Sequence, residues 1–174
     1  MSDVLRSELV GTSALTLAAI LALLLAVHRR PVPSRGDERR RTALILACLV
    51  ALQALHFVEE YATHFYERFP VMVGLAPWPA SFFIVFNLTW LIAWAVSVIG
   101  VRGGARPAFF AAWFLAIAGM VNGVAHPLLA LQAAGYFPGL ITSPLVGING
   151  VLLWKHLIAM TEAQSSTDAL TDRL

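Results

Sequence analysis

Residues 42–62 read TALILACLVALQALHFVEEYA, an apolar run that ends in a cluster of ionisable side chains. A helix crosses a bilayer with about 20 mostly apolar residues at about 1.5 Å rise each, so this run is long enough to span a membrane. His56, Glu59 and Glu60 then fall within one helical turn near the end of the span. Because ionisable groups are costly in hydrocarbon, their presence there indicates function.

The composition agrees with a membrane protein. Of the 174 residues, 59% are apolar and only 13% are charged, which is far too hydrophobic for a water-soluble domain of this size. The formal charge is +2, but most basic residues lie in one short loop. They therefore indicate the membrane topology and not a nucleic-acid partner. The single cysteine, Cys48, excludes an internal disulfide.

Five stretches are long and apolar enough to cross a bilayer. The first is too long for the apolar core of a signal peptide, and arginines follow it instead of preceding it, so we expect it to remain as a helix. The sequence therefore predicts an all-α, multi-pass bundle of about five transmembrane helices in the cell membrane, near residues 9–27, 42–62, 80–100, 108–132 and 140–160.

The arginines predict the orientation of these helices. Loop 28–41 carries six arginines and loop 101–107 carries two, whereas Arg68 is the one arginine of loop 61–79. Cytoplasmic loops are enriched in Lys and Arg, so the N-terminus is predicted outside and the C-terminus in the cytoplasm.

We expect three parts in the chain. An N-terminal helix and basic cytoplasmic loop occupy residues 1–42, a four-helix membrane domain occupies residues 43–160, and a polar cytoplasmic tail follows over residues 161–174.

Helix rise brings polar residues of several helices to one depth. At about 1.5 Å per residue from the cytoplasmic side, Glu59 and Glu60 lie roughly 26 Å up and His126 roughly 27 Å up. His56 and Asn122 both lie roughly 21 Å up. Counting down from the outer ends brings two more polar residues close to this level, Asn87 and Thr142. We therefore expect one polar site in the outer half of the bundle.

Three short motifs carry a resemblance to a known family. HFVEE at 56–60 has the form HxxEE, NGVAH at 122–126 has the form NxxxH, and PGLIT at 138–142 has the form PGxxT. The chain resembles the HXXEE-domain family of membrane proteins, whose three named motifs are these, in this order. The resemblance spans roughly residues 43–160 and implies an enzymatic function without an established reaction.

One hypothesis for the site is a metal centre. His56, Glu60 and His126 form a His₂Glu ligand set, which typically leaves one coordination position open. Zinc is the first expectation for these ligands, although iron and manganese accept them too. Glu59 would act as a general base on a bound water, and the substrate would be lipid-like or amphipathic. The candidate catalytic residues are His56, Glu59, Glu60, Asn122, His126 and Thr142, of which Asn122 and Thr142 would orient ligands or substrate.

Two other classes fit the same residues. A carboxyl group kept protonated by an apolar site, beside a histidine, suits a metal-free isomerase, hydratase or cyclase of a lipid or isoprenoid. A binding or transport protein with a Glu-His proton relay is the third class. Polar residues also commonly hydrogen-bond between membrane helices without any further role, and a homo-oligomer is compatible with all of these readings.

Some neighbouring residues have ordinary interpretations. His64 is expected to be interfacial, although a longer helix would make it a further ligand. Arg68 is the candidate salt-bridge partner for the glutamates from the outer loop. An aromatic line with helical spacing more often packs in a core or faces lipid than bounds a lipid-shaped pocket, and this applies to Phe82, Phe86, Trp90 and Trp94.

Overall fold

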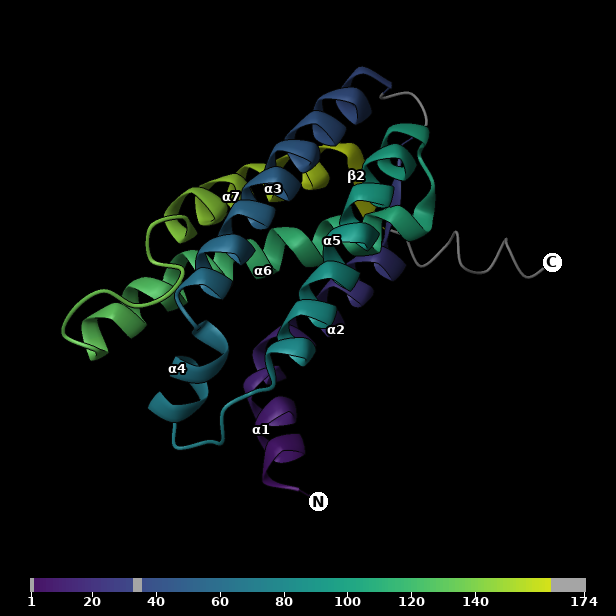
Figure 1. Ribbon diagram of the computed structural model, residues 1–174. Coiled ribbons are helices and arrows are strands. Elements are labelled where there is room, and N and C mark those ends of the chain that lie inside the picture. Colours follow the sequence, from purple (N-terminus) through teal and green to yellow (C-terminus); the bar gives the residue numbers. More distant parts are fainter. Residues whose placement is uncertain (1, 33–35, 164–174) are drawn as a thin grey trace.

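The computed structural model describes residues 2–32 and 36–163 (Figure 1). Its elements are α1 (Asp3–Gly11), α2 (Ser13–His28), β1 (Arg29–Pro31), α3 (Gly36–Ala62), α4 (Phe65–Met72), α5 (Ala80–Gly103), α6 (Arg106–Gln132), α7 (Ser143–Met160) and β2 (Thr161–Ala163). Helices α3, α5, α6 and α7 are each long and apolar enough to cross a membrane, and α1 with α2 makes a possible fifth span bent by 45°. The all-helical bundle with four or five spans is confirmed. The orientation of its termini stays a prediction.

Helix α6 is the centre of the bundle and packs against α2, α5 and α7. Every residue from Ala111 to Gly119 is buried. Its contact with α7 is close because glycines face each other: a Cβ on Gly123 would lie 2.7 Å from the Cα of Gly147. Small residues allow such an approach of two membrane helices. Gly119 also lies close to α7, since a Cβ there would lie 3.1 Å from the Val146 carbonyl oxygen.

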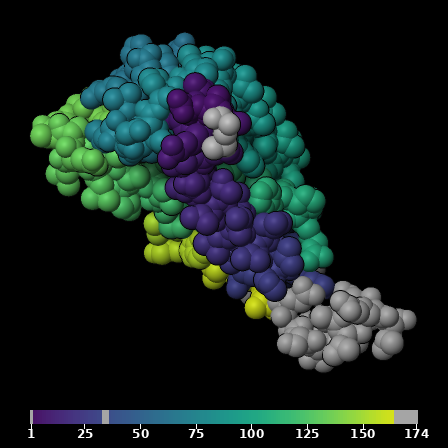
Figure 2. Space-filling model, turned by 90° about the horizontal axis from the view of Figure 1, so that it is seen from below, coloured from purple at the N-terminus to yellow at the C-terminus, as the bar shows by residue number. Residues whose placement is uncertain are grey.

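The first predicted span differs from expectation because it is broken at Thr12. The Thr12 hydroxyl donates to the Glu8 carbonyl at 2.7 Å, a back-bond that commonly bends helices. A residue distant in sequence also anchors α1, because the Trp78 indole N–H donates to the Ser7 hydroxyl at 3.1 Å. Figure 2 shows α1 and α2 along one face of the molecule, in front of the teal segments.

Three further departures come from the connections. Loop 61–79 contains the extra helix α4, which follows His64 in a left-handed conformation with φ of 61°. The last span begins at Ser143, because residues 138–142 form a turn. Residues 161–163 of the predicted loose tail pair antiparallel with β1, while residues 164–174 lie outside the described residues.

Candidate metal centre

Helix α3 turns two of its ionisable side chains into the bundle. His56 and Glu60 are four residues apart and therefore share a face, and both are buried, with exposed fractions of 0% and 6%. Helix α6 supplies His126 at the same level, 2% exposed. The equal depth expected from helix rise is thus realised as direct contact.

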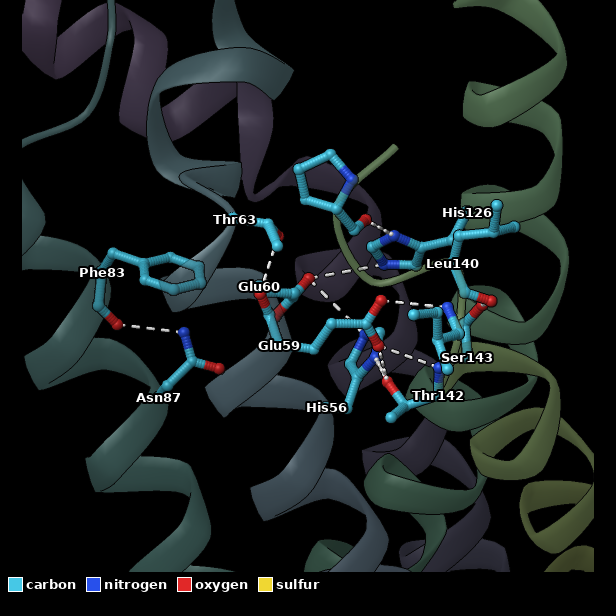
Figure 3. Close-up of polar contacts among 12 residues, drawn as sticks. His56, Glu59, Glu60, Thr63, Phe83, Asn87, His126, Leu140, Thr142 and Ser143 are labelled. Carbon is cyan, nitrogen blue, oxygen red and sulfur yellow. Dashed lines mark hydrogen bonds and ion pairs between the residues drawn. The ribbon is translucent and has the colours of Figure 1, made fainter. Parts of the chain in front are cut away.

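The three side chains converge on one point (Figure 3). Glu60 Oε1 lies 3.5 Å from His56 Nε2 and 3.4 Å from His126 Nε2. The two imidazole rings meet edge to face with centroids 4.7 Å apart. One ligand atom from each residue lies within 4.8 Å of the others, so the set could hold a metal ion.

The tautomer of His126 follows from its partner. His126 Nδ1 lies 2.6 Å from the Pro138 carbonyl oxygen. A carbonyl only accepts hydrogen bonds, so Nδ1 carries the proton and donates it. In the neutral ring, Nε2 is then a bare lone pair that points at Glu60.

His56 is in the same state for a parallel reason. Its Nδ1 lies 2.7 Å from the Thr142 hydroxyl oxygen, and that hydroxyl donates its own hydrogen to Glu59 Oε2. Thr142 therefore accepts from His56, and Nδ1 carries the proton. Within the described part of the chain, the buried His56 Nε2 has no hydrogen-bond partner. In its neutral form, each histidine thus offers an unprotonated Nε2 atom to the Glu60 carboxyl group.

Glu59 is bound by the loop before α7 instead of facing the cluster. Its carboxylate accepts from the Tyr136 hydroxyl at 2.8 Å, and from the N–H groups of Ile141 and Thr142, both at 2.9 Å. These amides precede the N-terminus of α7, where the helix dipole favours an anion. Burial and the hydrogen bond to this carboxylate raise the pKa of Tyr136.

Gly139 explains why the turn passes so close to the histidines. It has φ of 85°, a left-handed conformation that suits glycine. A Cβ at this position would overlap the rings of both His126 and His56. The Pro-Gly pair therefore lets the turn lie on the two imidazoles and present the Pro138 carbonyl to one of them.

A family model described as a protein of unknown function with the HXXEE motif matches residues 47–153. The chain belongs to the HXXEE family. No curated protein and no solved structure matches the chain. The matched segment of this HXXEE protein includes the three side chains that converge and the loop that binds Glu59.

A cavity opens beside the HXXEE cluster and holds about 940 Å³ of empty space, counting the part that opens outward. Glu60 and His126 form part of its wall. The wall continues with aromatic side chains of α5, and all four residues of the aromatic line contribute to it, namely Phe82, Phe86, Trp90 and Trp94. In this protein the line bounds a cavity, and its Trp90 and Trp94 rings also pack on Phe114 of α6.

The remaining candidate residues have clear places. Asn122 lines the cavity one turn below His126. His64 lies beyond the end of α3, where its ring contacts the Tyr66 hydroxyl at 3.1 Å, and it does not belong to the group of three possible metal ligands. Arg68 does not take the predicted role beside the glutamates: it donates to the Tyr136 carbonyl at 3.2 Å and lies over the Phe137 ring.

Sequence reasoning missed three contributors. Tyr136 and the Pro138 carbonyl reach Glu59 and His126 because of the path of the loop before α7, which the sequence does not specify. Gln53 also lines the cavity and is only 5% exposed. A signal for it was present, because an amide seven residues before Glu60 lies on the same helical face in an otherwise apolar run.

Proposed function

We propose that this protein is a metal-dependent membrane enzyme whose ligands are His56, Glu60 and His126. One observation carries the proposal: the Nε2 atoms of two histidines and a carboxyl oxygen face one another in a buried site while both Nδ1 atoms are used elsewhere. Tetrahedral zinc with bonds of about 2.0–2.2 Å separates its ligand atoms by about 3.3–3.6 Å. The two separations from Glu60 Oε1, 3.5 and 3.4 Å, match that spacing, and all three ligand atoms lie within 4.8 Å of one another.

The ligand number supports a catalytic metal. Structural zinc sites are closed by four protein ligands, whereas catalytic sites combine three with one open position. Since Glu60 and His126 line the cavity, an open position on that side is reachable by a substrate. A divalent ion there would polarise a carbonyl group or activate water, as in hydrolysis of an ester or amide.

The Glu59 contacts support a positioning role for this residue. Its carboxylate already accepts from three residues of the loop, which leaves little capacity to take a proton from water. Through Thr142 it orients His56, and such outer partners commonly tune a metal ligand. We therefore favour this role for Glu59 over the general base.

The mostly apolar, aromatic cavity supports a lipid-like or amphipathic substrate. In a multi-pass protein of the cell membrane, with the N-terminus outside as the arginines predict, the site opens within the outer half of the bilayer. Reporter fusions after Arg41 and Arg106 are expected to report the cytoplasm, and one near Arg68 the outside. The reverse pattern would place the site in the inner half.

A metal-free acid/base enzyme is the second candidate, because the Glu60 carboxyl group lies within reach of two imidazoles. Such a site suits isomerisation, hydration or cyclisation. We favour the metal because a single proton on Glu60 satisfies only one Nε2 and leaves the other buried and unpaired, whereas a cation satisfies all three atoms. A binding or transport protein is the third possibility.

The test is elemental analysis of protein purified in mild detergent without a chelator. We expect about one equivalent of a transition metal, lost in His56→Ala, His126→Ala and Glu60→Gln because each removes a ligand. His64→Ala and Glu67→Gln are matched controls on the exposed outer loop and should keep the metal. Wild-type protein without stoichiometric metal, even after zinc is added and excess removed, would overturn the proposal in favour of the acid/base enzyme.

A further inference from the structure

The cavity contains a second polar level below the HXXEE cluster. Three carboxamide side chains line it, one from each of α3, α5 and α6: Gln53, Asn87 and Asn122. We call these residues the carboxamide tier. Gln53 precedes Glu60 by seven residues and therefore lies about 10 Å deeper along α3, while Asn122 lies about 6 Å below His126.

Ring packing gives Asn87 the same depth as Gln53. The Phe83 ring on α5 packs on the Phe57 ring of α3, with centroids 5.6 Å apart. Asn87 is one turn deeper than Phe83, and Gln53 is one turn deeper than Phe57, so the two amides are level across the cavity.

The wall of the cavity at the tier holds carbonyl oxygens that accept no hydrogen bond from the described residues. Gln53 is nineteen-twentieths buried, and its Oε1 has no hydrogen-bond partner among the described residues. Asn87 uses its N–H₂ group to donate to the Phe83 carbonyl at 3.0 Å, which leaves its carbonyl oxygen as the free end. A buried acceptor without a donor costs about 1–3 kcal/mol, so a ligand that supplies a donor here is favoured.

The rest of the cavity is long and apolar. Its lining on α6 runs from Phe114 to Leu129, a length of about 22 Å. Below the tier, the Trp90 and Trp94 rings line the cavity and pack on Phe114 at 4.5 and 5.6 Å between centroids.

We infer that the substrate is an uncharged single-chain amphiphile that carries a hydroxyl group in mid-chain. Its reactive head lies at Glu60 and His126, its hydroxyl donates to the Gln53 and Asn87 oxygens, and its apolar end lies against Trp90 and Trp94. The substrate is uncharged at the tier because every tier residue is a neutral amide. The inference rests on the proposed function for the position of the reactive head only.

The test compares three neutral probes that displace a fluorescent fatty ester from the detergent-solubilised full chain. The probes are methyl stearate, its mid-chain hydroxyl derivative, and the derivative with the hydroxyl beside the ester. We expect the mid-chain hydroxyl to improve affinity about 5–10-fold, as one hydrogen bond to a buried acceptor provides. The other derivative should bind no better than methyl stearate.

Variants assign the preference to the tier. Gln53→Met is nearly isosteric and should reduce the ratio of the affinities for the mid-chain hydroxyl probe and methyl stearate to about one. Asn87→Leu should also reduce this ratio and serves as the test if the first variant folds poorly. Asn149→Leu is the matched control, because this amide lies on α7 and donates to the Leu145 carbonyl away from the cavity. Equal affinities in the wild type, or a preference that survives both tier variants, would overturn the inference.

The measurement is repeated after treatment with a chelator. A hydroxyl preference that persists without metal supports the tier whatever the fate of the metal proposal, because Gln53 and Asn87 do not belong to the ligand set. Loss of the preference in metal-free protein that remains folded would overturn the assignment to the tier.

Discussion

Two adjacent glutamates near the C-terminal end of α3 have different surroundings. Glu59 faces the loop before α7 and accepts hydrogen bonds from Tyr136, Ile141 and Thr142. Glu60 faces two imidazole nitrogens that carry no proton in the neutral rings. The Glu59 carboxylate receives its hydrogen bonds from the protein, whereas the described residues donate none to Glu60 in this arrangement. A set of buried polar atoms whose hydrogen bonds are not all made therefore marks where a ligand binds, more than the presence of charge does.

The largest expected effect tests this contrast directly. Glu60→Gln should abolish stoichiometric metal binding while leaving the metal-free protein as stable or more stable, because a buried ionisable group is neutralised. Glu59→Gln should keep most of the metal but lose about 1–3 kcal/mol of stability, because its amide N–H₂ would face donors. Metal content and thermal unfolding in detergent measure both. If the two variants behave alike, the proposed division of roles is wrong.

Gly139→Ala should have the next largest effect. The added methyl group would overlap both imidazole rings in a left-handed conformation, so we expect a loss of about 2–4 kcal/mol of stability and of most metal binding. Gly135→Ala is the control, since a Cβ there meets nothing within 4 Å. Equal unfolding temperatures for the two variants would mean that the turn does not lie on the histidines.

Thr142→Val tests the link between Glu59 and His56. The variant keeps the shape but removes the hydroxyl that accepts from His56 and donates to Glu59. Outer partners of metal ligands are typically worth 10–100-fold in affinity, so zinc affinity should fall by about that factor and be restored at higher zinc concentration. A Thr142→Ser variant should retain near wild-type affinity in the same zinc titration. Unchanged affinity in the valine variant would refute the role of Thr142 as orienter of His56.

Tyr136→Phe should have the smallest effect. It removes one of the hydrogen bonds to Glu59 at a position that is 41% exposed, where water can replace the hydroxyl. We expect a loss of about 0.5–1 kcal/mol in stability and little change in zinc affinity. A loss of metal as large as in Thr142→Val would show that Glu59 depends on Tyr136 more than on the backbone amides.

Much of this arrangement was predictable from the sequence. Apolar run lengths determined the membrane helices, and the constant rise of an α-helix placed Glu60 and His126 at one depth, with His56 about one turn away. Helical spacing also determined that His56 and Glu60 share a face and that Gly119 and Gly123 permit a close helix contact. These properties are local or depend on distance along one axis, so they need no knowledge of the packing.

The proton positions and the hydrogen-bond partners within the site depend on the tertiary structure. Depth along a helix does not specify the path of a loop, so the tautomers of His56 and His126 became evident only when Thr142 and the Pro138 carbonyl were located. The separation of Glu59 from Glu60, the bend at Thr12 and the cavity between several helices likewise depend on contacts distant in sequence. Such contacts are decided by how whole surfaces fit together, which no local pattern of residues records.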